Sequence, residues 1–244
     1  MLNNLLYKLA FISLVSCSTL LAQSVVQADR LGRPAWIFTP KPMRPESASN
    51  SESPSVRKAR DVFFDVPGST PLVAHDLMDY SHPSGGGADF YVTRDPLPTG
   101  ISDVVAVVQV SSTQPFVSSD KSMVYSELYG TVLKPVVDKK NLLSSSSVVI
   151  LQRGGTLQLP SGQVLSAMPY GGSNPIRIGT RYLLFLQYHP ATAGYTVARA
   201  WNLDGSKPQE LDDDGHPLKR ATNNLEDATS TETNLEAYVR AHQP

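Results

Sequence analysis

Pro175-Ile-Arg-Ile-Gly-Thr-Arg-Tyr-Leu-Leu-Phe-Leu-Gln-Tyr188 carries the strongest strand signal in this sequence. From Tyr182 to Leu186 the residues are apolar without a break, and Gly179 and Pro190 bound the run. A run this short, with such flanks, is typical of a strand buried on both faces rather than of a surface helix. Because successive side chains of a strand point to opposite faces, neither face is left for water. We therefore predict a central strand here.

Further short apolar runs, separated by turns that contain glycine or proline, occur on both sides of this stretch. They predict strands at residues 103–111, 122–134, 147–153, 156–159, 163–165, 195–201 and 208–211. Gly130 falls inside the second run, where a glycine commonly marks a bulge or a sharp bend. Residues 112–121 predict a polar loop, and Pro-Ser-Gly at 160–162 predicts a hairpin tip. The pattern predicts an all-β domain: a small, partly open barrel of the OB type or, alternatively, a sandwich.

A short helix is predicted near the C-terminus, between Thr231 and His242. Thr233 and Glu236 have the spacing of a capping box, and an apolar stripe runs along the same segment. We expect this helix to end a tail that follows the β domain.

The N-terminal residues 1–22 have the pattern of an export signal, with a lysine in a short polar start and an apolar stretch from Leu9 to Leu21. Since that stretch is shorter than the roughly twenty residues needed to span a bilayer, we expect cleavage near Ala22. The alternative is lipidation, because Leu-Val-Ser-Cys at residues 14–17 resembles a bacterial lipobox, whose cysteine is diacylated. Either route exports the protein, to the periplasm or beyond, with attachment to the outer membrane if Cys17 carries lipid.

A proline- and serine-rich segment, residues 23–60, follows the signal. Such a composition cannot bury enough apolar surface to offset chain entropy, so we predict a disordered linker. The basic cluster Arg57–Arg60 is interpreted as solvated linker charge. Two later apolar patches, 62–64 and 90–92, are expected to dock on the β domain as short edge pieces. The expected organisation is an export signal (1–22), a linker (23–60), an irregular docking segment (61–96), the β domain (97–215) and a tail with a helix (216–244).

Three motifs resemble those of a group of secreted bacterial proteins without an assigned activity. They are Tyr125-Ser126-Glu127 in a strand, Gly154-Gly155 followed by the Pro-Ser-Gly hairpin tip, and Gly-x-x-Tyr-Leu-Leu-Phe-Leu from Gly179. The resemblance covers about residues 97–211. It implies the boundaries of the β domain and no reaction.

Charge and cysteine content exclude several classes of protein. The chain has 21 Lys and Arg against 22 Asp and Glu, and the basic residues are scattered. No electrostatic footprint for nucleic acid is present, so we expect no nucleic-acid partner, and a membrane partner only if Cys17 is lipidated. Cys17 is the single cysteine and lies in the N-terminal apolar segment, so the mature body can hold neither a disulfide framework nor a cysteine metal site.

Two groups of residues have metal-binding side chains close together in sequence. His75, Asp76, Asp79 and His82 lie on an expected loop without the convergence that a site needs, and we interpret them as solvated. Asp212–Asp214 has the composition of a calcium loop but fails its register, so we predict a solvated acidic turn. We assign no metal ligands and expect no cofactor.

Catalytic patterns are equally weak. Ser118 and Lys121 match Ser-x-x-Lys, but the motif falls in a polar loop and lacks its partner motifs. The five histidines show no ligand or triad spacing, although His75, His189 and His216 could converge in a hydrolase. We assign no catalytic residue.

Strand aromatics offer one further possibility, because OB barrels stack ligands on aromatic side chains. The strand aromatics of the second half are Tyr182, Tyr188, Tyr195 and Trp201, and burial is the commoner fate of such residues. The sequence therefore favours an exported, non-enzymatic module that binds a protein or a cell-envelope component. The alternatives are an envelope-associated hydrolase and, by analogy of fold alone, a protease-inhibitor-like module.

Overall fold

The computed structural model describes residues 41–42, 52–74, 97–143, 145–167, 176–211 and 229–243. The chain divides into two units, Met1–Phe38 and Thr39–Pro244, and all described residues belong to the second. The expectations for Cys17, for the export signal and for most of the linker lie outside the described residues.

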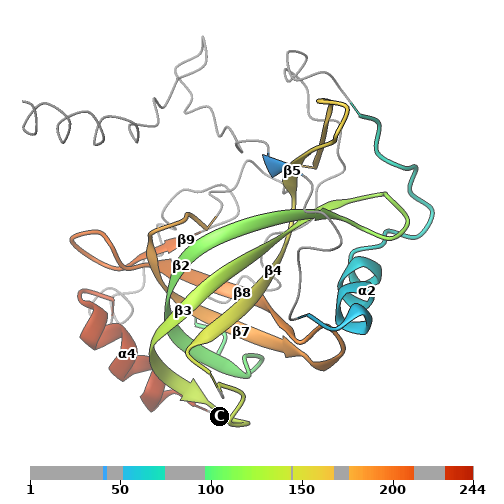
Figure 1. Cartoon of the computed structure of the whole chain (residues 1–244). Helices are drawn as coiled ribbons and strands as arrows, with labels where there is room; N and C mark the ends of the chain where they lie inside the picture. Colours follow the sequence, from blue (N-terminus) through green and yellow to red (C-terminus); the bar gives the residue numbers. More distant parts are fainter. Residues whose placement is uncertain are drawn as a thin grey trace, which may run out of the picture. The chain divides into compact units, whose positions relative to one another are not determined.

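A six-stranded sheet forms the body of this unit, in the order β4-β3-β2-β7-β8-β9 (Figure 1). Its strands are β2 (Val104–Val117), β3 (Val124–Asp138), β4 (Ser147–Arg153), β7 (Arg181–His189), β8 (Gly194–Asn202) and β9 (Gln209–Leu211). Strand β4 also meets β8 in parallel, where Ile150 faces Tyr195. The sheet is thereby partly closed without forming a complete barrel. The predicted all-β, partly open architecture is confirmed.

Strand β7 is central, as predicted, because it pairs with β2 on one side and β8 on the other. All five side chains from Tyr182 to Leu186 are at most 1% exposed. They alternate between two cores. Tyr182, Leu184 and Leu186 belong to the interior core, which the sheet encloses, while Leu183 and Phe185 belong to a second core on its outer face.

Helix α4 (Glu232–Ala241) covers this outer core with Leu235 and Val239, both fully buried. The helix was predicted, but the predicted capping box at Thr233 is wrong. Thr231 is the N-cap, and its side chain accepts a hydrogen bond from the Asn234 amide. Glu236 is buried and forms an ion pair with Lys134 of β3 instead.

The hairpin of β2 and β3 extends further than predicted. Residues 112–117 belong to β2, so the predicted loop 112–121 is wrong, and the true turn spans 118–123. The pairing register shifts between Val110 and Ser112, opposite Gly130. A Cβ at Gly130 would lie 2.5 Å from the Val108 Cγ1 atom. The predicted irregularity at this glycine is confirmed, as a register shift on the partner strand.

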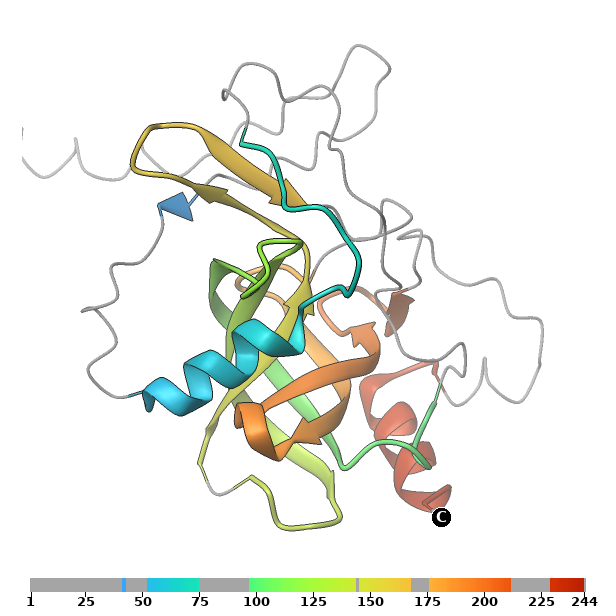
Figure 2. The same ribbon diagram turned by 90° about the vertical axis from the view of Figure 1, so that its right-hand side faces the viewer.

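A small second sheet joins β1 (Lys41–Pro42), β5 (Gly155–Gln158) and β6 (Val164–Ala167). Strands β5 and β6 form the predicted hairpin, which projects from the main sheet in Figure 2. Strand β1 pairs with β5 in parallel.

Helix α2 (Pro54–Phe63) corrects two expectations. The predicted linker does not extend to residue 60, and the patch at 62–64 docks on the β domain through Phe64, as the end of a helix rather than as an edge piece. The patch at 90–92 lies outside the described residues. Ser53 followed by Pro54 is a recognised helix start, since proline is favoured in the first turn. Helices α2 and α4 both lie on the outer face of the main sheet, at separate places around it (Figures 1 and 2).

No helix in the described part of the chain is long and apolar enough to cross a membrane.

Candidate functional site

A fully buried carboxylate lies on the outer face of β3. Leu128 belongs to the interior core, and because strand side chains alternate, its neighbour Glu127 points the other way, beneath α2. The Glu127 side chain is 0% exposed. A carboxylate removed from water is tolerated only when charges and hydrogen bonds compensate it.

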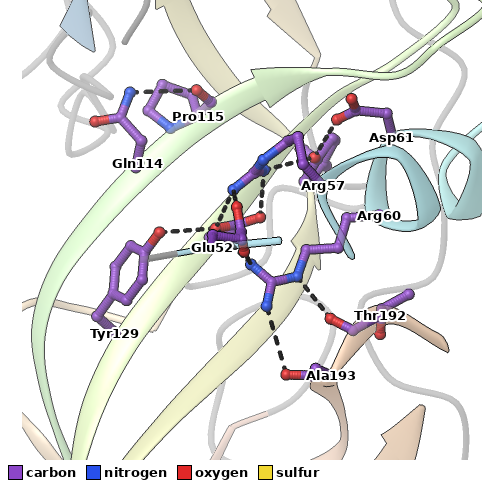
Figure 3. A network of polar contacts seen from close by, with 11 residues as sticks. Glu52, Arg57, Arg60, Asp61, Gln114, Pro115, Tyr129, Thr192 and Ala193 are labelled. Atoms are coloured by element: carbon purple, nitrogen blue, oxygen red, sulfur yellow. Dashed lines mark hydrogen bonds and ion pairs between the residues drawn. The ribbon is translucent and has the colours of Figure 1, made fainter. Parts of the chain in front are cut away.

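Two arginines of α2 supply that compensation (Figure 3). Arg57 approaches Glu127 with both terminal nitrogens, Nη1 to Oε1 at 2.6 Å and Nη2 to Oε2 at 3.1 Å. The Arg60 Nη1 atom lies 3.1 Å from Oε2. The hydroxyl of Tyr129 donates to the same oxygen at 2.7 Å. Two-point pairing of a guanidinium with a carboxylate is among the strongest and most directional of protein contacts.

Glu52 adds a second carboxylate from the residues before α2. It pairs with both Arg57 and Arg60. With Asp61, the site contains three carboxylates and two guanidinium groups, which gives a formal charge of −1 (two positive, three negative) when all are ionised.

Aromatic side chains line the same outer face. The Tyr125 ring stacks on Phe64 at 4.4 Å between centroids and on Phe116 of β2 at 5.6 Å. The Tyr125 hydroxyl donates to Asp61 at 2.6 Å, and the Arg57 guanidinium carbon lies 3.8 Å from the centre of the Phe116 ring. Phe64, just after α2, thus stacks on Tyr125, and Arg57 of α2 makes a cation–π contact with Phe116.

The loop between β7 and β8 forms one edge of the site. This loop contains the short 3-10 helix η4 (Pro190–Thr192). Arg60 is only 4% exposed, and its Nε donates to the Thr192 carbonyl at 2.8 Å. A longer contact runs from Nη2 to the Ala193 carbonyl at 3.4 Å. Arg60 therefore links α2 to this loop as well as to β3.

The turn between β2 and β3 forms another edge. Asp120 accepts hydrogen bonds from the hydroxyls of Ser118 and Ser122 and from the Val66 amide. Asp65 accepts from the Ser119 hydroxyl and the Asp120 amide. These contacts fasten the residues that follow α2 to the turn.

Electrostatics keep most of the site in fixed protonation states near neutral pH. Burial favours the neutral form of Arg57, but the hydrogen bond and charge of Glu127 outweigh it and raise the arginine's pKa above its usual value. Burial, together with the charge of Glu127, raises the pKa of Tyr129 to about 12. Burial also raises the pKa of Tyr125. Burial raises the pKa of Asp61 as well, against the opposing effect of the hydrogen bond from Tyr125. The arginine and tyrosine protons are therefore held near neutral pH, and Asp61 is a carboxyl of the site that is shifted toward its neutral form.

The residues weighed for catalysis are not brought together where the structure describes them. Ser118 and Lys121 lie in the β2–β3 turn, where the Ser118 hydroxyl donates to Asp120 and accepts from the Met123 amide. His189 forms a hydrogen bond of 2.7 Å with Thr196 and contacts the Phe63 ring. Burial lowers the pKa of His189. His75 and His216 lie outside the described residues.

The metal-binding candidates at residues 75–82 and at Asp212–Asp214 also lie outside the described residues. Within the described ranges, no three His, Cys, Asp or Glu side chains are close enough to hold a metal ion.

The aromatic stacking platform, the less favoured possibility for the strand aromatics, is not formed by these four side chains. Tyr182 and Tyr195 lie in the interior core, with Tyr188 packed against it, while Trp201 lies in the outer core on the side of α4. Burial, the commoner fate, is confirmed for Tyr182, Tyr195 and Trp201, which are at most 6% exposed.

The interpretation of Arg57 and Arg60 as solvated linker charge is wrong. Their spacing of three places both on one side of a helix, and the Ser53-Pro54 start was the available signal. Their partner Glu127 lies 70 residues beyond Arg57, so no local pattern could pair them.

Comparison with protein-family models, with curated proteins and with solved structures finds no match for this chain. The chemistry of the site itself is therefore the basis for assigning a function.

Proposed function

We propose that this chain is an exported, non-enzymatic binding module that recognises a polypeptide through the outer face of β2, β3 and β4. The proposal rests on the kinds of side chain that this face combines. It combines aromatic rings, Phe116 and Tyr125, with the fully buried carboxylate of Glu127, and a helix is already bound to it.

The position of the site supports a binding role by analogy with OB barrels. In those barrels, ligands bind on the face of the second and third strands, between the loop joining strands one and two and the loop joining strands four and five. If β2, β3, β4, β7 and β8 are taken as strands one to five, these loops are 118–123 and 190–193. Helix α2 and the residues after it contact the strand face and both loops.

The chemistry of the face selects the kind of ligand. Glu127 favours a cation, and the aromatic rings favour planar groups, including guanidinium. A phosphate backbone would be repelled, which agrees with the scattered basic residues of the chain. An arginine-containing polypeptide fits both requirements, whereas a nucleic acid fits one at most.

The proposed export rests on the signal pattern of residues 1–22. An exported chain meets cell-envelope and extracellular proteins, so the partner is proposed to be one of these. Mass spectrometry of the mature N-terminus tests this part of the proposal. We expect a chain that begins after Ala22, or a diacylated Cys17 if the lipobox is used. A chain that retains Met1 in the cytoplasm would contradict export.

The envelope-associated hydrolase and the protease-inhibitor-like module are the alternatives from sequence. No contact among the described residues specifically favours either.

Site-specific photocrosslinking tests the binding face. A photoreactive amino acid replaces Gln114, whose register opposite Glu127 places it on the same face, and the full-length chain is exposed to envelope extract. The matched control places the same probe at Leu133, a 48% exposed position further along β3. We expect a discrete crosslinked polypeptide from position 114 and none from position 133. Equal crosslinking at both positions, or none at either, would overturn the proposal.

A further inference from the structure

We infer that α2 is an intramolecular ligand of the outer face, and that the partner displaces it by presenting the same chemistry. That chemistry is two arginines one helical turn apart, followed by an aromatic side chain. The inference rests on the proposed function and specifies the class of partner.

The arginine contacts of this helix follow one pattern of donors and acceptors, whereas the Tyr125 hydroxyl donates in the opposite sense, from the sheet to Asp61 of the helix. The sheet and its loop supply acceptors, which are both oxygens of Glu127 and the carbonyls of Thr192 and Ala193. The helix supplies the guanidinium donors of Arg57 and Arg60. Because these arginines are three residues apart, they project from one side of the helix, and the face recognises a spacing rather than a single charge.

Helix α2 has few means of its own to stay folded. Ser53 makes no side-chain capping bond, and the first turn contains no acidic residue. A helix of 10 residues is marginal in isolation. Val62 and Phe63 are 49% and 38% exposed, and the buried apolar anchor is Phe64, the residue that follows the helix and stacks on Tyr125. What holds α2 is largely the set of contacts that a competing segment could reproduce.

The energetics of buried ion pairs favour exchange between equivalent ligands. The attraction between Glu127 and the arginines is largely offset by the cost of removing them from water. A competitor with the same groups replaces these contacts without a new desolvation penalty. A competitor without these groups would leave Glu127 buried and unpaired. The free-energy cost of that unpaired carboxylate therefore selects segments that carry the two arginines.

Lysine is a poor substitute for either arginine at this face. Its ammonium group cannot reproduce the two-point contact with Glu127, and it lacks the planar surface that Arg57 lays over Phe116. The residues after α2 remain fastened to the 118–123 turn through Asp65 and Asp120. The helix could therefore leave the face while its C-terminal end stays tethered.

Fluorescence anisotropy with a labelled peptide of residues 52–66 tests the inference on full-length chains. We expect the R57A/R60A chain, whose own helix has lost its guanidinium groups, to bind the peptide at least tenfold more tightly than the wild-type chain. Adding E127Q to that variant should abolish binding. A peptide in which both arginines are lysine should bind the R57A/R60A chain at least tenfold more weakly.

The matched control is R181A, which removes an arginine that pairs with Asp204 and Glu232 away from the site. This chain should bind the peptide as weakly as the wild type. Circular dichroism confirms that each variant is folded. If R57A/R60A does not fold, the R57K/R60K chain takes its place, because it keeps the charges and loses only the two-point geometry.

Equal affinity of the wild-type and arginine-substituted chains would overturn the inference, as would equal affinity for the arginine and lysine peptides. The two proposals fail separately. A crosslinked partner at position 114 that the peptide does not displace would refute the intramolecular ligand and leave the binding face standing. The absence of any crosslink would refute the proposed function itself.

Discussion

Glu127 shows what a single residue contributes to this molecule. Strand alternation placed its side chain on the same face as Tyr125 and Tyr129, and this much could be predicted from the sequence. Its burial could not, because the arginines that make burial tolerable come from a helix 70 residues away. A glutamate between two tyrosines in a strand is ordinarily a solvated residue, and only the tertiary contact changes its role.

Substitution of Glu127 by glutamine tests the energetic importance of the buried carboxylate. Removing one partner of a buried ion pair leaves the other uncompensated, and we expect a loss of about 3 kcal/mol in the free energy of unfolding. The matched control is Glu232→Gln, whose ion pair with Arg181 is over a third exposed on both sides and should contribute below about 1 kcal/mol. Urea unfolding measures both. Equal losses in the two variants would contradict the role given to Glu127.

Asp120 predicts a pH dependence of stability. The Ser122 hydroxyl, with further hydrogen bonds from the Ser122 amide, Ser118 and Val66, holds the pKa of this carboxyl well below its usual value of 3.8. A depressed pKa stabilises the folded state above the unfolded-state value, and this stabilisation is lost as pH falls from about 4.

The variant Asp120→Asn lacks this titration. We expect the difference in unfolding free energy between the wild type and Asp120→Asn to shrink as pH is lowered from about 5 to about 2. Chemical denaturation at each pH measures it. A difference that stays constant over the range would show that Asp120 does not titrate in the expected sense.

At the scale of elements, the strands were predictable where their own side chains fill a core. The runs that became β4, β7 and β8 are rich in apolar residues, and their predicted bounds agree with the observed ones within about three residues. Helix α2 was missed because its apolar residues are few and a proline-rich sequence surrounds it. The end of β2 was missed because residues 112–115 are Ser-Thr-Gln-Pro, which resembles a loop, and a register shift separates them from the apolar part of the strand.

The register shift itself gives a prediction for the β2–β3 hairpin. A Cβ at Gly130 would meet the fully buried Val108 at 2.5 Å, so Gly130→Ala should destabilise the fold by about 1–3 kcal/mol. A methyl group at Gly100 would have no other atom within 4 Å, which makes Gly100→Ala the matched control, with little expected change. Thermal unfolding compares them. Similar melting temperatures for the two variants would show that the hairpin accommodates the methyl group.

The central position of β7 gives a stronger prediction. Leu184 is fully buried between β2 and β8, so Leu184→Asp should place an unpaired charge in the interior core and abolish soluble folding. Leu133→Asp, at a 48% exposed position of β3, should remain folded. Soluble yield and circular dichroism report the outcome. A folded Leu184→Asp protein would remove β7 from the centre of the architecture.

At the scale of the whole molecule, composition and strand pattern predicted a partly closed β domain with a terminal helix, and the structure has both. The order of the strands, the contact of β4 with β8 and the docking of α2 on the outer face depend on contacts between distant segments. Such contacts leave no periodic signal in one sequence. The candidate site is made almost entirely of them, which explains why the fold was more predictable than the site.

The central claim is that α2 is a replaceable occupant of a binding face rather than a fixed part of the barrel. Native-state hydrogen exchange of the full-length wild-type chain tests it most directly, because it measures the opening free energy of each segment separately. We predict that the amides of α2 exchange through a local opening well below the global free energy of unfolding, while those of β7 exchange only through global unfolding. Exchange of α2 and β7 with the same free energy would contradict the claim.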